Sequence, residues 1–181
     1  VLSANGLILT NWHVIEDYEV VGVRFFPNSG LPESAILADV LKYDEVSDLA
    51  LLQLKTVPSN LVAVRGAQEL PPVGSDVHAI GHPHGQDWSY TRGYVSQVRP
   101  GYEWSYEDGT QHTAEIVQTQ TPINPGNSGG PLFDGDGALI GVNSFSDATG
   151  EGLNYAVSIN EVKKFLASKE SRRAEREPEW V

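Results

Sequence analysis

Short apolar runs, separated by residues that favour turns, extend over most of this 181-residue chain and restrict its fold more than any other feature. Apolar and other residues alternate from Val21 to Phe25, which is the spacing of a strand with one buried face. Turn-forming pairs such as Asp108-Gly109 separate the runs. Many short strands joined by frequent turns predict an all-β sandwich or barrel. The expected strands are residues 7–10, 20–26, 35–43, 49–54, 77–80, 90–98, 115–119, 138–144 and 153–157.

One helix is expected near the C-terminal end of the chain. Ser158 and Glu161 have the spacing of a capping box, in which two side chains satisfy free N–H groups of the first turn. Apolar residues on one helical face follow: Ile159, Val162, Phe165 and Leu166. After Ser168 the apolar stripe ends and charged residues dominate, so residues 169–181 are expected to form a frayed, charged tail or linker.

Composition argues against several classes of protein. The chain has 24 acidic and 12 basic residues, which disfavours nucleic acid as a partner because phosphates require clustered Lys and Arg. No apolar run approaches the roughly 20 residues of a membrane span. The chain contains no cysteine, which excludes disulfides, thiol catalysis and thiolate metal sites. The fold therefore relies on its hydrophobic core.

Two polar groups match metal sites only in part. His78, His82 and His84 lie close together, but no convincing pair of carboxylates accompanies them, so a loop is the favoured interpretation. Residues 134–137 (DGDG) begin like a calcium-binding loop, but apolar residues stand where two further ligands are needed. A hairpin turn explains that segment better. Neither a metal nor another cofactor is expected.

A glycine-rich segment around Ser128 carries the strongest chemical signal. Residues 125–131 (PGNSGGP) contain three glycines, which allow a backbone path that residues with a Cβ do not follow easily. Such a path can direct successive N–H groups into one small space, as the stabilisation of an oxyanion beside a nucleophile requires. The alternative is an ordinary glycine turn that contains a serine.

A serine nucleophile needs a base. His13 stands just after the apolar run 7–10, and Asp48 directly precedes the apolar run 49–54. Taken alone, each would more often be structural, as a surface histidine or a turn-forming aspartate. The order His, Asp, Ser, with all three residues at strand boundaries, favours a nucleophilic triad instead.

The segments around these three residues resemble those of chymotrypsin-fold serine peptidases, and most closely the bacterial HtrA (Deg) branch. The similarity rests on the motifs TNWHV at residues 10–14, SDLAL at 47–51 and INPGNSGGPL at 123–132. Two supporting motifs are AIGHPHG at 79–85 and GLNYAV at 152–157. Together the similarity extends over about residues 2–166. Trp12 departs from the family pattern, which has a small or polar residue before the histidine.

The resemblance implies an all-β fold with two perpendicular six-stranded antiparallel β-barrels, a cleft between them and a C-terminal helix. Residues 1–168 would form one peptidase domain, with barrels at about 1–60 and 73–158 and the helix at about 159–168. Residues 58–72 would join the barrels. The chain begins inside what should be the first strand of the family, so the beginning of the first barrel is expected to be missing.

The resemblance also implies a mechanism. Ser128 would attack the peptide carbonyl, His13 would transfer the proton, and Asp48 would orient the imidazole. The backbone N–H groups of Gly126 and Ser128 would form the oxyanion hole. The substrate-binding residues would be Pro122, Ile123, Asn143, Ser144, Phe145 and Asn154. Without an acidic residue at its base, that pocket is expected to accept small aliphatic side chains.

The expected function is a serine endopeptidase that cuts unfolded or extended polypeptides in HtrA-like protein quality control, in the periplasm or outside the cell. Any homo-oligomer would form through segments outside this sequence. The alternative is a catalytically latent, chaperone-like or peptide-binding module on the same fold. A lipase or esterase is disfavoured, because its serine usually stands in a G-x-S-x-G turn.

Overall fold

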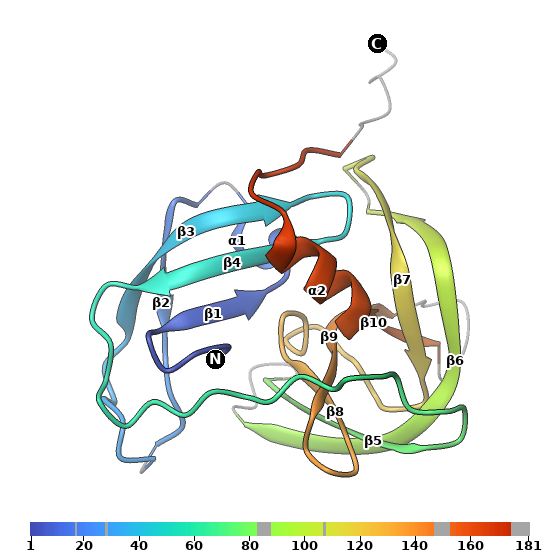
Figure 1. The fold of residues 1–181 in the computed structure, drawn as a ribbon, viewed down its shortest axis with the longest axis horizontal. Helices are drawn as coiled ribbons and strands as arrows, with labels where there is room; N and C mark the ends of the chain where they lie inside the picture. The colour runs from blue at the N-terminus through green and yellow to red at the C-terminus, as the bar shows by residue number, and fades with distance from the viewer. Residues whose placement is uncertain (17, 28, 83–87, 107, 147–152, 175–181) are drawn as a thin grey trace.

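The computed structural model describes residues 1–174 except residues 17, 28, 83–87, 107 and 147–152. Two antiparallel sheets and two helices are present, as Figure 1 shows. The first sheet has the strand order β1-β4-β3-β2. Its members are β1 (Leu7–Thr10), β2 (Val20–Val23), β3 (Ile36–Asp44) and β4 (Leu49–Leu54).

The second sheet closes into a barrel with the order β10-β7-β6-β5-β8-β9. Its members are β5 (Asp76–Gly81), β6 (Ser89–Ser105), β7 (Gln111–Thr119), β8 (Pro131–Asp134), β9 (Leu139–Ser146) and β10 (Asn154–Ser158). In Figure 1, β1, β3 and β4 of the first sheet run from side to side, whereas β7 of the barrel runs from top to bottom. The expected all-β class and the six-stranded second barrel are confirmed.

The first sheet differs from the expected six-stranded barrel, because the described residues contribute only four strands to it. The strand expected at 20–26 ends at Val23, and the described residues between β2 and β3 form turns and bends. That segment contains Pro27 and Pro32, which have no N–H group to donate to a strand ladder. Residues 55–75 run to the barrel without forming a further strand of the first sheet.

Three strands of the barrel and one short helix differ from expectation. β7 begins at Gln111, four residues before its expected start. β6 continues past its expected end at residue 98 and through Pro100 and Gly101, because a bulge between Arg99 and Tyr102 absorbs them and Gly101 takes φ +59°. The β6–β7 hairpin is therefore longer than expected and contacts the turn between β3 and β4 of the first sheet. β8 and the helical turn α1 (Trp12–Ile15) are too short to give a periodic signal.

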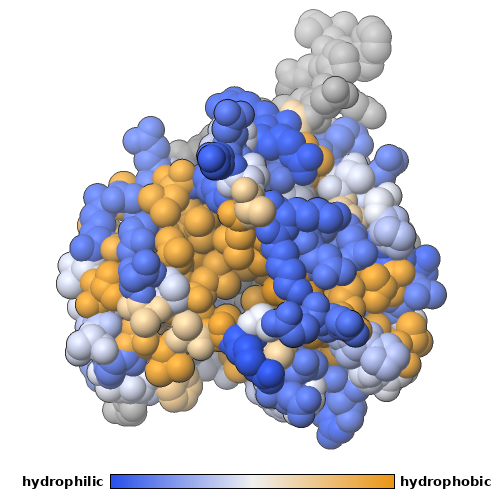
Figure 2. All heavy atoms as spheres, viewed as in Figure 1, coloured by the Kyte–Doolittle hydropathy of each residue, from blue (hydrophilic) through white to orange (hydrophobic). Residues whose placement is uncertain are grey.

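Apolar side chains of the barrel strands, of the helix α2 (Ile159–Ala167) and of β4 form the largest core cluster, to which β4 contributes Leu49 and Leu51. Ser158 Oγ accepts a hydrogen bond from Glu161 N at 3.2 Å, which is half of the expected capping box. The helix buries Ile159, Val162 and Phe165. Figure 2 shows apolar surface gathered over the first sheet. An apolar pocket of about 280 Å³ there is lined by residues of both sheets.

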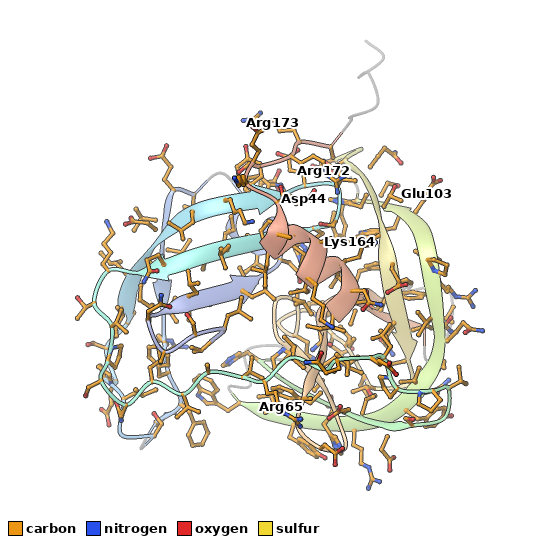
Figure 3. All side chains as sticks on the ribbon, in the orientation of Figure 1. Asp44, Arg65, Glu103, Lys164, Arg172 and Arg173 are labelled. Atoms are coloured by element: carbon orange, nitrogen blue, oxygen red, sulfur yellow. The ribbon has the colours of Figure 1, made fainter. Side chains whose placement is uncertain are left out.

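The segment after α2 packs on β3 instead of fraying. Arg172 forms two hydrogen bonds to the Asp44 carboxylate, at 2.8 and 2.9 Å, and Figure 3 shows the two residues together. Their backbones also pair as an isolated bridge. Lys42 Nζ donates to the carbonyls of Phe165 and Ser168, both at 2.6 Å, at the C-terminal end of α2. The expected free tail is therefore wrong for this segment, and residues 175–181 lie outside the described residues.

Candidate active site

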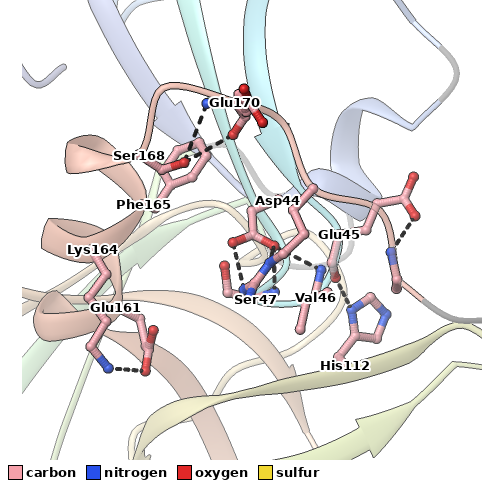
Figure 4. Close-up of polar contacts among 12 residues, drawn as sticks. Asp44, Glu45, Val46, Ser47, His112, Glu161, Lys164, Phe165, Ser168 and Glu170 are labelled. Atoms are coloured by element: carbon pink, nitrogen blue, oxygen red, sulfur yellow. Dashed lines mark hydrogen bonds and ion pairs between the residues drawn. The ribbon is translucent and has the colours of Figure 1, made fainter.

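A tight turn between β3 and β4 presents Asp48. Asp44 Oδ1 accepts hydrogen bonds from the amides of Val46 at 3.0 Å and Ser47 at 3.2 Å, as Figure 4 shows. Asp48 then takes φ +55°, a left-handed conformation that aspartate tolerates better than most residues. This backbone turns the carboxylate inward, and Asp48 is fully buried.

His13 is held against Asp48 by both its backbone and its ring. His13 N donates to Asp48 Oδ1 at 3.0 Å, and His13 Nδ1 lies 2.8 Å from Asp48 Oδ2. Because a carboxylate only accepts hydrogen bonds, this contact keeps the proton of the neutral imidazole on Nδ1 and leaves the Nε2 lone pair free. Trp12 stacks on Tyr43 with ring centroids 4.2 Å apart, which fixes the helical turn that carries His13.

Two hydroxyl groups from the barrel complete the shell of the carboxylate. Ser144 Oγ donates to Asp48 Oδ2 at 2.6 Å. Tyr106 OH donates to the same oxygen at 3.3 Å, from the β6–β7 hairpin. Sequence reasoning expected Ser144 among the substrate-binding residues and missed Tyr106. The stretch around Tyr106 has no motif, and only the hairpin geometry brings it to the site.

Ser144 connects Ser128 to the His13–Asp48 pair. Ser128 Oγ donates to the Ser144 carbonyl at 2.9 Å, while the Ser144 hydroxyl binds Asp48. Within the described part of the chain, no hydrogen bond joins Ser128 to His13. Contacts between a nucleophile and its base are often long or poorly aligned in a free enzyme and tighten when substrate binds.

The turn around Ser128 leaves two backbone donors unpaired. Three of its five amides have acceptors: Asn127 N binds Asn124 O, Gly129 N binds Asn143 O and Gly130 N binds Asn127 O, at 2.8 to 3.0 Å. Among the described residues, the amides of Gly126 and Ser128 have no hydrogen-bond acceptor. They are the two donors expected to form the oxyanion hole. Gly126 has φ +101°, which a residue with a Cβ rarely adopts.

Asn11 connects the Asp48 turn to the Ser128 turn. Its Nδ2 donates to the Asp48 carbonyl at 2.8 Å, and its Oδ1 accepts from Gly129 N at 2.6 Å. The side chain is fully buried between the two sheets. Sequence reasoning included Asn11 in the histidine motif without giving it a role. One amide therefore sets the spacing between the segments that carry the expected base, His13, and the expected nucleophile, Ser128.

A model of the trypsin-like peptidase domain matches residues 1–142 of the chain. The chain belongs to the trypsin-like peptidase family. This peptidase domain is 36% identical over 165 residues to the serine protease Do-like HtrA of Bacillus subtilis, covering 89% of this chain and 35% of that protein. It is 36% identical over 163 residues to a probable periplasmic serine endoprotease DegP-like of Pseudomonas fluorescens, covering 88% and 32%.

The crystal structure of the serine endoprotease from Yersinia pestis aligns on the peptidase domain with a TM-score of 0.74 and 30% identity. That alignment covers 92% of this chain and 54% of the other. These similarities confirm the expected resemblance to the HtrA branch. The chain spans about a third of the length of the two curated relatives.

The expected substrate-binding residues of the peptidase domain lie on three segments: 122–123 after β7, 143–145 in β9, and Asn154 at the start of β10. Ile123 is buried, and its amide donates to Asn154 Oδ1 at 3.3 Å. The Pro122 carbonyl accepts from Asn127 Nδ2 at 3.2 Å, so the base of the expected pocket is tied to the Ser128 turn. Asn143 and Ser144 are buried in β9. The Phe145 ring packs among Tyr102, Trp104 and Tyr155.

The histidines considered as metal ligands have other partners. His78 Nδ1 lies 2.6 Å from Tyr90 OH, and the His82 ring packs edge-on against Trp88. His84 lies outside the described residues. No group of three or more His, Cys, Asp or Glu side chains within the described residues could hold a metal ion. Asp134 Oδ1 accepts from the amides of Asp136 and Ala138, as in a hairpin turn.

Proposed function

We propose that this domain is a serine endopeptidase with His13, Asp48 and Ser128 as its triad. The observation that carries the proposal is the double hydrogen bond from His13 to the buried Asp48 carboxylate. A fully buried carboxylate is costly unless it is paired, and an imidazolium is the partner that acyl transfer creates on this site. A binding module would have no need of a histidine held with its Nε2 free.

In the proposed reaction, the Ser128 hydroxyl turns from the Ser144 carbonyl to His13 Nε2. Ser128 Oγ attacks the carbonyl carbon of the peptide bond, and its proton moves to Nε2. The carbonyl oxygen becomes an oxyanion, which the amides of Gly126 and Ser128 stabilise. His13 then gives the proton to the leaving amine, and water hydrolyses the acyl-enzyme by the same steps.

The proposed substrates are unfolded or extended polypeptides cut after small aliphatic residues. Support comes from Ile123 at the wall of the expected pocket and from the absence of Asp and Glu among its expected lining residues. Burying an unpaired Lys or Arg there would cost several kcal/mol. The similarity to the probable periplasmic endoprotease of Pseudomonas fluorescens supports a location outside the cytoplasm. Within the described residues, none of the helices has the length and apolarity to span a membrane.

One observation favours the alternative of a latent peptide-binding module, namely the hydrogen bond of Ser128 to the Ser144 carbonyl instead of to His13. A fluorophosphonate probe separates the two functions, because it reacts only with an activated serine. We expect labelling of the wild type and of Ser29→Ala, which changes an exposed serine between β2 and β3, and no labelling of Ser128→Ala. Equal labelling of all three proteins, or none of the wild type, would favour the latent module.

A further inference from the structure

We propose that Tyr106 is a positioning residue for the His13–Asp48 pair, a role that rests on the proposed peptidase function. Its hydroxyl oxygen lies 3.2 Å from His13 Nδ1, 3.3 Å from Asp48 Oδ2 and 3.4 Å from Ser144 Oγ. No other side chain outside the expected triad approaches both the base and the carboxylate among the described residues. Tyr106 belongs to the barrel, whereas the pair belongs to the first sheet.

The hairpin that carries Tyr106 is joined to the Asp48 turn by other contacts. His112 Nδ1 donates to the Glu45 carbonyl at 2.6 Å, as Figure 4 shows, and Thr113 N donates to the Val46 carbonyl at 2.7 Å. The edge of the Tyr106 ring meets the buried His112 ring, with centroids 4.8 Å apart. The hydroxyl is therefore held over the pair by a backbone that is itself tied to the turn before Asp48.

The chemistry of the hydroxyl fixes the direction of its hydrogen bonds. Burial, and then the charge of Asp48, raise the pKa of Tyr106 well above its usual range, so the hydroxyl keeps its proton at neutral pH. Donation of that proton to Asp48 Oδ2 leaves lone pairs of the oxygen toward His13 Nδ1. Both contacts favour the tautomer with the proton on Nδ1, which is the tautomer that can accept the Ser128 proton on Nε2.

The second effect is electrostatic. Asp48 Oδ2 already accepts from Ser144, and a further hydroxyl donor disperses its negative charge. A carboxylate with dispersed charge attracts an imidazolium less strongly, whereas the hydroxyl lone pairs that face Nδ1 stabilise it. Removal of the hydroxyl therefore changes how readily the imidazole takes up a second proton. Other ionisable groups close to the pair are His112 beside the Tyr106 ring and Glu16, which follows α1. A hydroxyl deletion changes neither.

Tyr106→Phe removes the hydroxyl and retains the ring. We expect kcat for a peptide substrate to fall about tenfold while KM stays constant, because the lost contact orients the base and does not touch the substrate. The acidic limb of the pH profile of kcat/KM should move by about half a pH unit. Tyr90→Phe is the matched control: it also removes a hydroxyl that contacts a histidine, but on the exposed face of β6.

A measurement on the resting protein separates this role from the proposed function. The NMR titration of the His13 ring should differ from the wild type in Tyr106→Phe and remain unchanged in Tyr90→Phe, whether or not the protein hydrolyses peptides. The effects of Tyr106→Phe and Ser144→Ala on the His13 titration should be non-additive in the double variant, since both hydroxyls donate to Asp48 Oδ2. Identical His13 titrations in the wild type and a folded Tyr106→Phe variant would overturn the proposal. A shifted titration with an unreactive Ser128 would support the contact and refute the peptidase function.

Discussion

Asn11→Ala tests whether one buried amide holds the two sheets in their relative position. The substitution removes the donor to the Asp48 carbonyl and one acceptor of the Gly129 amide. It leaves the helical turn α1 and both sheets otherwise intact. Because the side chain is fully buried, water does not replace these contacts without local opening.

The two lost hydrogen bonds differ in cost. The Asp48 carbonyl loses a buried partner, which costs about 1–3 kcal/mol. The Gly129 amide keeps its bond to the Asn143 carbonyl at 2.8 Å, so its loss is smaller, about 0.5–1.5 kcal/mol. With a small cavity in addition, the free energy of unfolding should fall by about 3 kcal/mol. For a domain of this size, that corresponds to a Tm lower by about 6–12 °C.

Urea unfolding followed by circular dichroism measures this loss directly. The control is Asn60→Ala, which removes a hydrogen bond of the same length, 2.8 Å, from Asn60 Nδ2 to the Gly30 carbonyl on the exposed surface. We expect the control to change stability by no more than about 0.5 kcal/mol. A loss below about 1 kcal/mol for Asn11→Ala, or equal losses for the two variants, would refute the inference that Asn11 links the Asp48 and Ser128 turns.

Three further predictions follow from other contacts. In Gly81→Ala the new Cβ would lie 2.9 Å from Asn127 Cα, so the Ser128 turn must move. Fluorophosphonate labelling of Ser128 should therefore slow at least tenfold. The control Gly135→Ala has open space around the new Cβ and should be labelled at the wild-type rate. Between about pH 10 and 12 the wild type should lose stability faster than Tyr106→Phe, by up to about 1.4 kcal/mol per pH unit. The reason is that the raised pKa keeps Tyr106 protonated in the folded state, whereas the tyrosine of the unfolded state ionises. Urea titrations at several pH values measure the two slopes, and equal slopes would contradict this prediction. Arg172→Ala should lower the free energy of unfolding by about 1 kcal/mol at low salt and by less at high salt, because the bidentate pair of Arg172 with Asp44 is partly exposed. Thermal unfolding at both salt concentrations measures the loss. A loss that does not change with salt would count against an ionic contact.

The elements that sequence reasoning placed correctly are those with a strong local signal. β1, β4 and α2 have apolar patterns with clear ends, and the capping contact of Ser158 follows from its spacing to Glu161. β6 extends beyond its expected end at residue 98, and the bulge that carries it past Pro100 depends on the partner strand and cannot be read locally. The docking of Arg172 on Asp44 joins residues 128 positions apart, beyond any local pattern.

The residues of the candidate site also differ in how far the sequence could predict them. His13 and Asp48 could be paired from the sequence because each ends or begins an apolar run, and the structure joins them by hydrogen bonds. The roles of Asn11 and Tyr106 depend on how the two sheets meet, which no property of their neighbours in the sequence encodes. The assignment of His13, Asp48 and Ser128 as a catalytic triad stays a prediction that the labelling experiment decides.

Burial of Asp48 couples the site to the docking of the sheets. A buried carboxylate costs several kcal/mol unless its oxygens are hydrogen-bonded. The first sheet region supplies two donors, both from His13, and the barrel supplies the other two, from Ser144 and Tyr106. If the sheets separate, the carboxylate loses the barrel donors and its negative charge is satisfied by His13 alone. A change in the docking of the sheets therefore changes the electrostatics at His13 before it changes any strand, so His13 should report movements of the β6–β7 hairpin.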